Sequence, residues 1–217
     1  MVLWKDLPFL ETQVKLHDVS KQFQSHSVFK NVSLDLRDGY RGVILGGNGS
    51  GKSTLLKVIS TALVPSTGTV LYSLNQEEIE ENARYKHVSF CAPYIDLIED
   101  FTLEEHITFQ QKFRPFIAGL SSAEIINRLQ LGRFKDRSIK NYSSGMRQRV
   151  RLALAIMADS ELLLLDEPTS NLDPKGKTWY KELLQEFAGK RSIIAGSNFL
   201  DEEFFFAKNT IELKDFQ

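Results

Sequence analysis

Residues 43–54 read Val-Ile-Leu-Gly-Gly-Asn-Gly-Ser-Gly-Lys-Ser-Thr, and this stretch decides how the rest of the chain is interpreted. A short apolar run meets a glycine-rich turn, and a helical pattern of apolar residues follows from Leu55. Gly46, four further residues, and then Gly51, Lys52 and Ser53 fit the P-loop pattern G-x4-G-K-[ST]. We therefore expect a strand, a phosphate-binding turn and a helix, in that order.

Each residue type in this turn has a chemical role in phosphate binding. Glycines let the backbone curl until successive N–H groups point at phosphate oxygens. The helix that opens at Gly51 adds unpaired N–H donors and the positive end of its dipole. Lys52 can reach the β- and γ-phosphates, and the Ser53 hydroxyl can coordinate Mg²⁺. The turn predicts binding of a nucleoside triphosphate with Mg²⁺. The residues expected to contact it here are Gly46, Gly47, Asn48, Gly49, Ser50, Gly51, Lys52, Ser53 and Thr54.

Length, charge and cysteine content narrow the class of protein. The chain has 217 residues, enough for one large domain with a buried core. Its net charge of −1 gives no bulk attraction to nucleic acid or to an anionic bilayer. The single cysteine, Cys91, lies in an apolar run and fits a reducing compartment. Residues 1–6 lack a signal-peptide pattern, and no apolar run approaches the roughly 18 residues that span a membrane. We expect a soluble, cytoplasmic chain that reaches any membrane by docking onto another subunit.

Hydrophobic periodicity predicts an α/β fold with a helical insertion. Alternating apolar residues predict strands over about 14–19, 32–36, 69–74 and 86–92, and the acidic segment 76–82 is predicted to be a helix or loop. Capping boxes at 102–105 and 121–124 open helices within a mostly helical segment. A buried strand over 161–165, a helix over 175–188 and a strand over 191–195 follow. A helix carrying Phe204, Phe205 and Phe206 and a strand near Ile211 close the chain.

Strands that alternate with helices favour a mostly parallel sheet. We therefore predict a P-loop NTPase core with an N-terminal β subdomain and an inserted helical subdomain. In this prediction residues 1–217 form a single domain, whose core comprises about 1–92 and 159–217 and whose helical subdomain comprises about 93–158.

The second half of the predicted site follows the buried strand, in the sequence Leu162-Leu163-Leu164-Leu165-Asp166-Glu167. Carboxylates at the carboxyl end of such a strand face the edge where ligands bind in open α/β folds. Asp166 would hold Mg²⁺ through water, and Glu167 would accept the proton of the attacking water. Acids that merely end a buried strand are the structural alternative.

Between these motifs lies Tyr142-Ser143-Ser144-Gly145-Met146, followed by an apolar-periodic helix. A serine before Ser-Gly at a helix start is a second anion-binding arrangement. Together these motifs make the chain resemble the nucleotide-binding subunit of an ABC transporter over nearly its whole length. Residues 46–53 match that family's Walker A motif and residues 162–167 its Walker B motif, and residues 142–146 are an altered form of its Leu-Ser-Gly-Gly-Gln signature.

The resemblance implies further roles and partners. Residues 170–173 resemble the D-loop, so that Asp173 is expected near the nucleotide, and Phe23 falls where the family stacks adenine. Two such chains would pair head to tail, so that Ser143, Ser144 and Gly145 of one chain contact the ATP bound to the other. The partner would be a second copy or a related ATPase subunit, and residues 93–158 would meet integral-membrane permease subunits at the inner face of the cell membrane. No nucleic acid is expected.

Two residues depart from the family pattern. Pro93 falls where a glutamine should contact Mg²⁺ and the attacking water, and it has no side-chain donor or acceptor. Asn198 replaces the histidine that follows the last core strand. An asparagine can still hydrogen-bond the γ-phosphate, but it cannot move a proton. The four histidines lie in no segment that could substitute for it: His17, His26, His87 and His106.

We therefore predict an ATPase that powers a transporter, with Glu167, Lys52 and Asn198 as catalytic residues and turnover slowed by the two departures. Two alternatives stay open. The chain could be a non-transport ABC ATPase that clamps ribosomes, RNA or DNA, or a cassette that binds ATP, hydrolyses it weakly and regulates a partner. The single cassette and the lack of a basic patch favour the transporter hypothesis.

Overall fold

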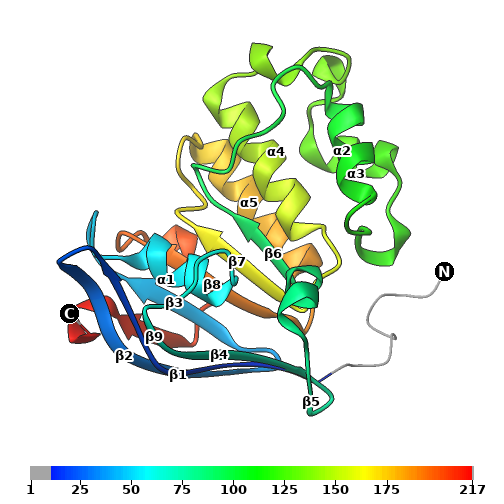
Figure 1. Cartoon of the computed structure of the whole chain (residues 1–217). Coiled ribbons are helices and arrows are strands. Elements are labelled where there is room, and N and C mark those ends of the chain that lie inside the picture. Colours follow the sequence, from blue (N-terminus) through cyan, green and yellow to red (C-terminus); the bar gives the residue numbers. More distant parts are fainter. Residues whose placement is uncertain (1–10, 217) are drawn as a thin grey trace. The chain divides into compact units, whose positions relative to one another are not determined.

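The computed structural model describes residues 11–216, so the predicted absence of a signal peptide concerns residues outside the described part. The chain divides into two compact units, and Figure 1 labels the helices and strands of both. The sheet unit comprises residues 11–90, 160–167 and 190–216, and the helical unit comprises residues 91–159 and 168–189. The predicted single-domain division stays a prediction.

The sheet unit contains two sheets and one α-helix. Its strands are β1 (Thr12–Phe23), β2 (His26–Arg37), β3 (Arg41–Leu45), β4 (Thr67–Leu74), β5 (Glu77–Glu78), β6 (Val88–Cys91), β7 (Leu162–Asp166), β8 (Ser192–Ser197) and β9 (Asn209–Glu212), and its helix is α1 (Lys52–Ile59). One sheet has the order β2-β1-β4-β5 and the other the order β6-β7-β8-β3-β9. The predicted mixed α/β fold with a largely parallel central sheet is confirmed.

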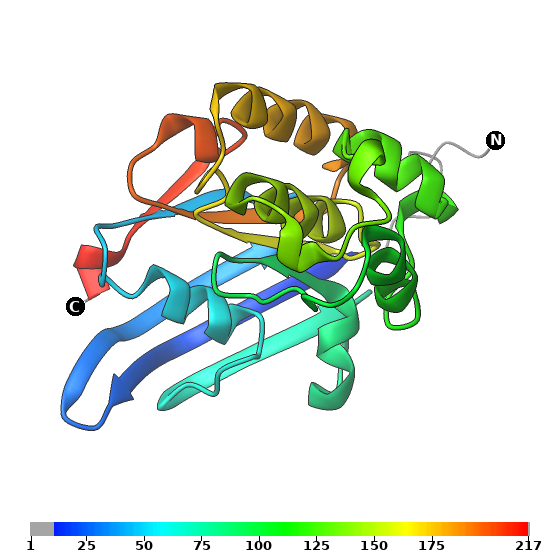
Figure 2. The same ribbon diagram turned by 90° about the horizontal axis from the view of Figure 1, so that it is seen from above.

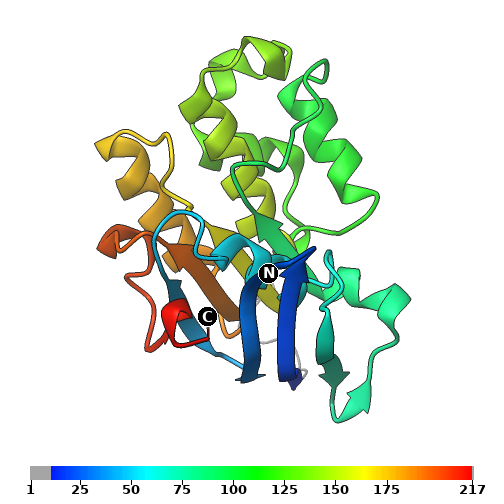
Figure 3. The ribbon, with the colours of Figure 1, turned by 60° about the vertical axis from the view of Figure 1, so that its left-hand side comes forward.

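The first sheet is built on a long antiparallel hairpin of β1 and β2, which lie side by side in Figure 3. The predicted alternation of apolar and polar residues is seen in these strands. Val14, Leu16 and Val32 are buried, while intervening side chains face water. In the second sheet β3 pairs in parallel with both β8 and β9. Parallel neighbours place the carboxyl ends of β3, β7 and β8 at one edge.

Two segment predictions need correction. The strand predicted over 69–74 starts earlier, at Thr67, because Thr67 pairs with Ser20 of β1. Gly68 permits this pairing, since it has φ +80° and a Cβ there would lie 2.4 Å from the Asp18 carbonyl oxygen. The acidic segment after it is neither a plain loop nor an α-helix. Glu77–Glu78 adds the short strand β5, and a 3-10 helix covers Glu81–His87, which shortens the following strand to Val88–Cys91.

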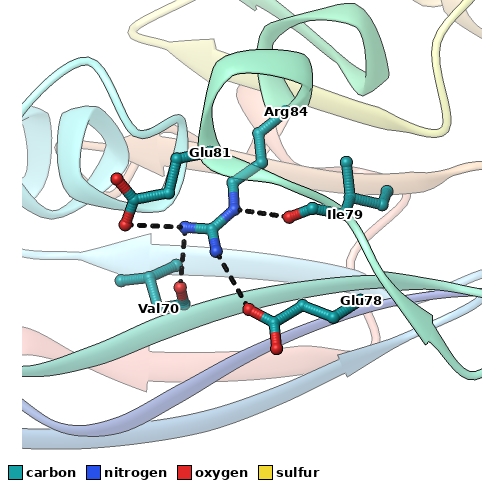
Figure 4. A network of polar contacts seen from close by, with 5 residues as sticks. All are labelled: Val70, Glu78, Ile79, Glu81 and Arg84. Carbon is teal, nitrogen blue, oxygen red and sulfur yellow. Dashed lines mark hydrogen bonds and ion pairs between the residues drawn. The ribbon is translucent and has the colours of Figure 1, made fainter.

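Arg84 explains this departure (Figure 4). Its side chain is buried and donates to the carbonyl oxygens of Val70 at 3.0 Å and Ile79 at 3.1 Å. It also pairs with the carboxylates of Glu78 at 3.4 Å and Glu81 at 3.8 Å. One guanidinium therefore ties β4, β5 and the 3-10 helix together.

The predicted C-terminal helix carrying the three phenylalanines is wrong. Only Asp201–Glu203 forms a single 3-10 turn, and β9 and a 3-10 helix over Leu213–Phe216 follow. Glu203 turns back to accept the hydroxyl of Ser197 at 2.6 Å, and Phe205 is exposed. Consecutive aromatics give no i, i+4 stripe, so a longer helix would gain no apolar face to bury.

The helical unit contains α2 (Leu103–Gln111), α3 (Ser122–Leu129), α4 (Ser144–Ile156) and α5 (Pro174–Phe187), and α4 and α5 run side by side (Figure 2). Both predicted capping boxes are present. Thr102 accepts from the amide of Glu105, and Ser121 accepts from the amide of Glu124. No helix in residues 11–216 is long and apolar enough to cross a bilayer.

Candidate nucleotide site

The glycine-rich turn joins β3 directly to α1. Gly51 is the N-cap of α1 with φ +102°, and a Cβ there would lie 2.5 Å from the Val28 side chain. Gly49 also has positive φ, at +78°. The turn between Leu45 and Lys52 therefore depends on glycine at both positions.

Lys52 turns back over this turn. The residue is 4 % exposed, and its Nζ donates to the carbonyl oxygens of Gly46 at 2.8 Å and Gly47 at 3.0 Å, and to Oδ1 of Asn198 at 2.6 Å. An ammonium group has three N–H donors, and these contacts use all of them. The lysine is thus held at the turn where a phosphate would lie.

The two carboxylates predicted from the sequence follow at the end of β7. Asp166 is 1 % exposed, and its Oδ1 lies 2.9 Å from the Cβ position at Gly196, while Cβ of Lys52 lies 3.6 Å from that same position. Gly196 therefore leaves room for the buried carboxylate beside the start of α1. Glu167 has φ 43°, and its N–H donates to the carbonyl of Gly196 at 2.9 Å.

Asn198 links three parts of the site. Its Nδ2 donates to Oε1 of Glu167 at 3.0 Å and to Oδ1 of Asn48 at 2.5 Å, and its Oδ1 accepts from Lys52. The end of β8 fixes this position, because the neighbouring Ser197 hydroxyl accepts from the Leu200 amide at 3.1 Å. The structure therefore brings together four of the predicted residues, Asn48, Lys52, Glu167 and Asn198.

Sequence reasoning missed Glu203. This carboxylate is 1 % exposed and lies behind Ser197. Burial lowers the pKa of Lys52 below its ordinary value, and three carboxylates oppose that shift: Glu167, Asp166 and Glu203. The sequence held no signal for this, since Glu203 lies in a run of three acids.

Phe23 ends β1 and is 48 % exposed, so its ring is available to a flat ligand. The ammonium of Lys21 lies 4.9 Å from the ring centroid and donates to the carbonyl of Val64 at 2.8 Å. This contact covers one face of the ring.

Four further predicted residues belong to the helical unit: Ser143, Ser144, Gly145 and Asp173. Ser143 is the N-cap of α4 and accepts from the amide of Met146 at 3.2 Å, and both Ser143 and Ser144 are exposed. Gly145 lies close to Asn171, whose carbonyl oxygen would be 3.0 Å from a Cβ. The carboxylate of Asp173 caps α5 by accepting from the amide of Gly176 at 2.7 Å.

Pro93 follows β6 at once, in a turn where the Ile95 amide donates to the Ala92 carbonyl at 3.1 Å. None of the histidines is found among the contacts described for Lys52, Glu167 and Asn198. His17 and His26 are exposed, His87 pairs with Glu161 at 3.0 Å, and His106 is buried.

A metal ion at this site would depend on few protein ligands. No group of three or more His, Cys, Asp or Glu side chains suited to a metal occurs within residues 11–216. Ser53 is the second residue of α1 and Asp166 is the last residue of β7, and their hydroxyl and carboxylate oxygens are hard donors. That donor set fits Mg²⁺, which usually keeps several waters and takes one or two protein ligands plus phosphate oxygens.

Sequence comparison relates the chain to ABC transporter proteins. A family model described as "ABC transporter" matches residues 29–170. The sulfate/thiosulfate import ATP-binding protein CysA of Nitrosomonas europaea is 33 % identical over 181 residues, which are 78 % of this chain and 50 % of that protein. Human phospholipid-transporting ATPase ABCA7 is 28 % identical over 200 residues, 90 % of this chain and 9 % of that protein. The chain thus spans half of the first relative and a small part of the second.

Solved structures share the fold. One is the cassette MJ0796, in a dimeric post-hydrolysis state bound to ADP and Pi. It has a TM-score of 0.78 and is 25 % identical, and the match covers 93 % of this chain and 94 % of the MJ0796 chain. A putative ABC transporter ATP-binding protein of Pyrococcus furiosus has a TM-score of 0.75 and 22 % identity, and covers 94 % of this chain and 99 % of that one.

Proposed function

Because this chain belongs to the ABC transporter family, as a nucleotide-binding ATPase cassette, we propose that it binds ATP with Mg²⁺ and hydrolyses it to power permease subunits. The observation that carries the proposal is the convergence of Lys52, Glu167 and Asn198 at one P-loop. That cluster combines a phosphate-binding cation, a carboxylate base and a neutral hydrogen-bonding group.

Binding would use the backbone first. The amides of residues 46–53 and the start of α1 would receive the phosphates, and Lys52 would exchange carbonyl partners for phosphate oxygens. Phe23 would stack on adenine. Ser53 and Asp166 would hold Mg²⁺, which when bound neutralises charge on the phosphate oxygens.

Hydrolysis would use Glu167 as the general base. A water oxygen would attack the γ-phosphorus, the bond from that phosphorus to the bridging oxygen of ADP would break, and the water proton would pass to Glu167. Asn198 would donate to the γ-phosphate. Pro93 supplies no side-chain contact to the water, and loss of one positioned contact typically costs about two to three decades in rate. We therefore expect slow turnover.

Coupling ATP hydrolysis to transport requires a second ATPase subunit and membrane subunits. Two copies, or this chain and a related subunit, would pair with the α4 terminus of each over the nucleotide of the other. The helical unit exposes apolar side chains suited to a membrane subunit: Tyr94, Ile98, Phe109 and Phe113. This would place the chain at the inner face of the membrane. The relatives named above differ in cargo, sulfate or thiosulfate for CysA and phospholipid for ABCA7, so the proposal concerns energising transport and not its substrate.

A binding measurement with Lys52→Ala tests the proposal. The variant should bind MgATP at least tenfold more weakly and lose ATP hydrolysis, because the phosphates lose their cation. Lys57→Ala, on the same helix, is the control and should retain both. A Lys52→Ala protein that holds MgATP as tightly as the parent would overturn the proposal.

A further inference from the structure

Asn48 and Gly49 form the one Asn-Gly dipeptide of the chain, in the middle of the phosphate turn. Every other asparagine precedes a residue with a side chain, as Asn82 precedes Ala83. In an Asn-Gly pair the side-chain amide carbon can come within reach of the next peptide nitrogen, and glycine has no Cβ to shield that nitrogen. Asn48 is therefore the asparagine of this chain that is most open to reaction with its own backbone.

The turn leaves both reacting groups open to water. Asn48 and Gly49 are exposed, and a Cβ built on Gly49 would have no heavy atom within 4 Å apart from those of its chain neighbours. No hydrogen bond within residues 11–216 uses the Gly49 N–H. A backbone N–H that is neither shielded nor bonded can lose its proton to the solvent, and this loss makes the peptide nitrogen a nucleophile.

The fold polarises the amide that this nitrogen would attack. Nδ2 of Asn198 donates to Oδ1 of Asn48 at 2.5 Å. A donor on this oxygen draws electron density from the amide carbon and stabilises the negative charge that forms on the oxygen during the attack. Asn198 follows the end of β8, so the sequence around Asn48 alone does not provide this donor.

We propose that Asn48 is a site of spontaneous deamidation whose rate is set by occupancy of the nucleotide site. The Gly49 nitrogen bonds to the side-chain carbon of Asn48, and the bond from that carbon to Nδ2 breaks. The proton of the Gly49 nitrogen leaves with the amide group as ammonia, and a cyclic imide remains. Water then opens the imide at either of its carbonyl groups and gives aspartate or isoaspartate.

The dependence on nucleotide rests on the proposed function. In that proposal the amides of residues 46–53 bind the phosphates, so a bound triphosphate engages the Gly49 N–H that reacts in the empty turn. Deamidation places a carboxylate in the turn, where it repels the phosphates, and isoaspartate also inserts an extra carbon into the backbone. Chains that stay empty therefore lose the ability to bind nucleotide, and occupied chains keep it.

The test incubates the full chain in mildly alkaline buffer, with and without Mg²⁺ and the non-hydrolysable β,γ-imido analogue of ATP. Peptide mapping by mass spectrometry follows the amide of Asn48 and, as an internal control, that of the exposed Asn82. We expect Asn48 to convert first and Asn82 to persist. With the analogue at about ten times its dissociation constant, roughly a tenth of the chains stay empty, so the conversion of Asn48 should slow about tenfold.

Titration calorimetry measures the effect of the modification on binding. The incubated parent should lose analogue binding in proportion to the converted fraction. Asn48→Asp, which copies one product, should bind the analogue at least about tenfold more weakly because its carboxylate repels the phosphates. Asn48→Gln is the matched control, because its longer side chain forms a cyclic imide far more slowly, and it should keep its affinity throughout the incubation.

An Asn48 amide that lasts as long as the Asn82 amide in the empty chain would overturn the proposed modification site. Conversion at the same rate with and without bound analogue would overturn its control by the nucleotide. Failure of the freshly prepared chain to bind the analogue would instead remove the proposed function, and conversion of Asn48 in the empty chain would still support the modification site.

Discussion

Glu167 adopts a backbone conformation that few residues other than glycine accept. Its φ of 43° lies in the left-handed region, where a residue other than glycine reduces the stability of the fold by of order 1 kcal/mol or more. The amide bond to Gly196 holds this conformation, and the carboxylate then meets Asn198. Strained backbone of this kind clusters at functional sites, which supports the role proposed for Glu167 as the base.

Glu167→Gln should separate binding from hydrolysis. The amide keeps the size and the hydrogen-bonding oxygen but cannot take a proton from water, so we expect the turnover of ATP to fall by at least a hundredfold. The affinity for MgATP should stay within about threefold of the parent, because Lys52 and the turn are intact. Steady-state hydrolysis and equilibrium binding measure the two quantities. Undiminished hydrolysis would exclude Glu167 as the base.

At the scale of residues, the sequence predicted the site residues that lie in contiguous motifs. Lys52 and Ser53 follow from a contiguous motif, and Asp166 and Glu167 follow from a buried strand that ends in acids. The roles of these residues stay predictions, while their positions at one sheet edge follow from parallel pairing. The amide pair of Asn48 and Asn198 had no local signal, because only the strand order brings residues so far apart together.

His106 should make stability depend on pH. Its ring is buried, and Nε2 accepts from the Ile98 amide at 2.8 Å. Burial lowers the pKa of His106 below its ordinary value of 6.5. Below that pH the unfolded chain takes up the proton and the folded chain does not. The free energy of unfolding should therefore fall as the pH drops from 6.5 to the folded pKa, by at most about 1.4 kcal/mol per pH unit, and the contribution is fully present above 6.5.

Urea unfolding of the parent and of His106→Gln between pH 7.5 and pH 5 measures this effect. The variant should lose less stability on acidification, because glutamine does not titrate. His17→Gln, at an exposed position, is the matched control and should follow the parent. Equal slopes for the parent and for His106→Gln would show that His106 takes up its proton equally in both states.

At the scale of elements, helix starts were predictable and the irregular segments were not. The capping boxes at Thr102 and Ser121 carry their own hydrogen-bond partners three residues on, so a short window suffices. The segment 77–87 depends instead on Arg84 reaching Val70 in β4, and the C-terminal turn depends on Glu203 reaching Ser197. Long-range contacts decided both segments, and local periodicity could not predict either.

Arg84→Ala should destabilise the β4–β5 edge. It removes the donors to two backbone carbonyls and leaves a void at a buried position, which typically costs about 2–3 kcal/mol. For a chain of this size the melting temperature should fall by roughly 5–10 °C. Arg37→Ala is the control, since the Arg37 side chain is 77 % exposed and its ion pair with Asp35 is screened by water. Equal melting temperatures for the two variants would contradict the role given to Arg84.

At the scale of the whole molecule, the chain carries two helix starts suited to a phosphate, α1 and α4. The start of α1 has Lys52 and the glycine turn beside it. The start of α4 has exposed serines and no acidic residue in its first turn, so its positive end is not neutralised locally. In the head-to-tail pair proposed above, the two termini of each chain would form two equivalent nucleotide sites with a second copy.

A charge placed at Ser144 tests that pairing. Glu167→Gln with MgATP should accumulate as a dimer of about twice 24.8 kDa, because bound ATP is not consumed. Adding Ser144→Glu should abolish the dimer, since a carboxylate at the α4 terminus repels the partner's phosphates while it favours the helix dipole of its own chain. The same carboxylate at Ser122, in the equivalent position of α3, is the matched control and should leave the dimer intact. Light scattering measures the mass, and nucleotide titration verifies that each chain still binds ATP. A Ser144→Glu dimer as stable as the Ser122→Glu dimer would place the α4 terminus away from the partner's nucleotide.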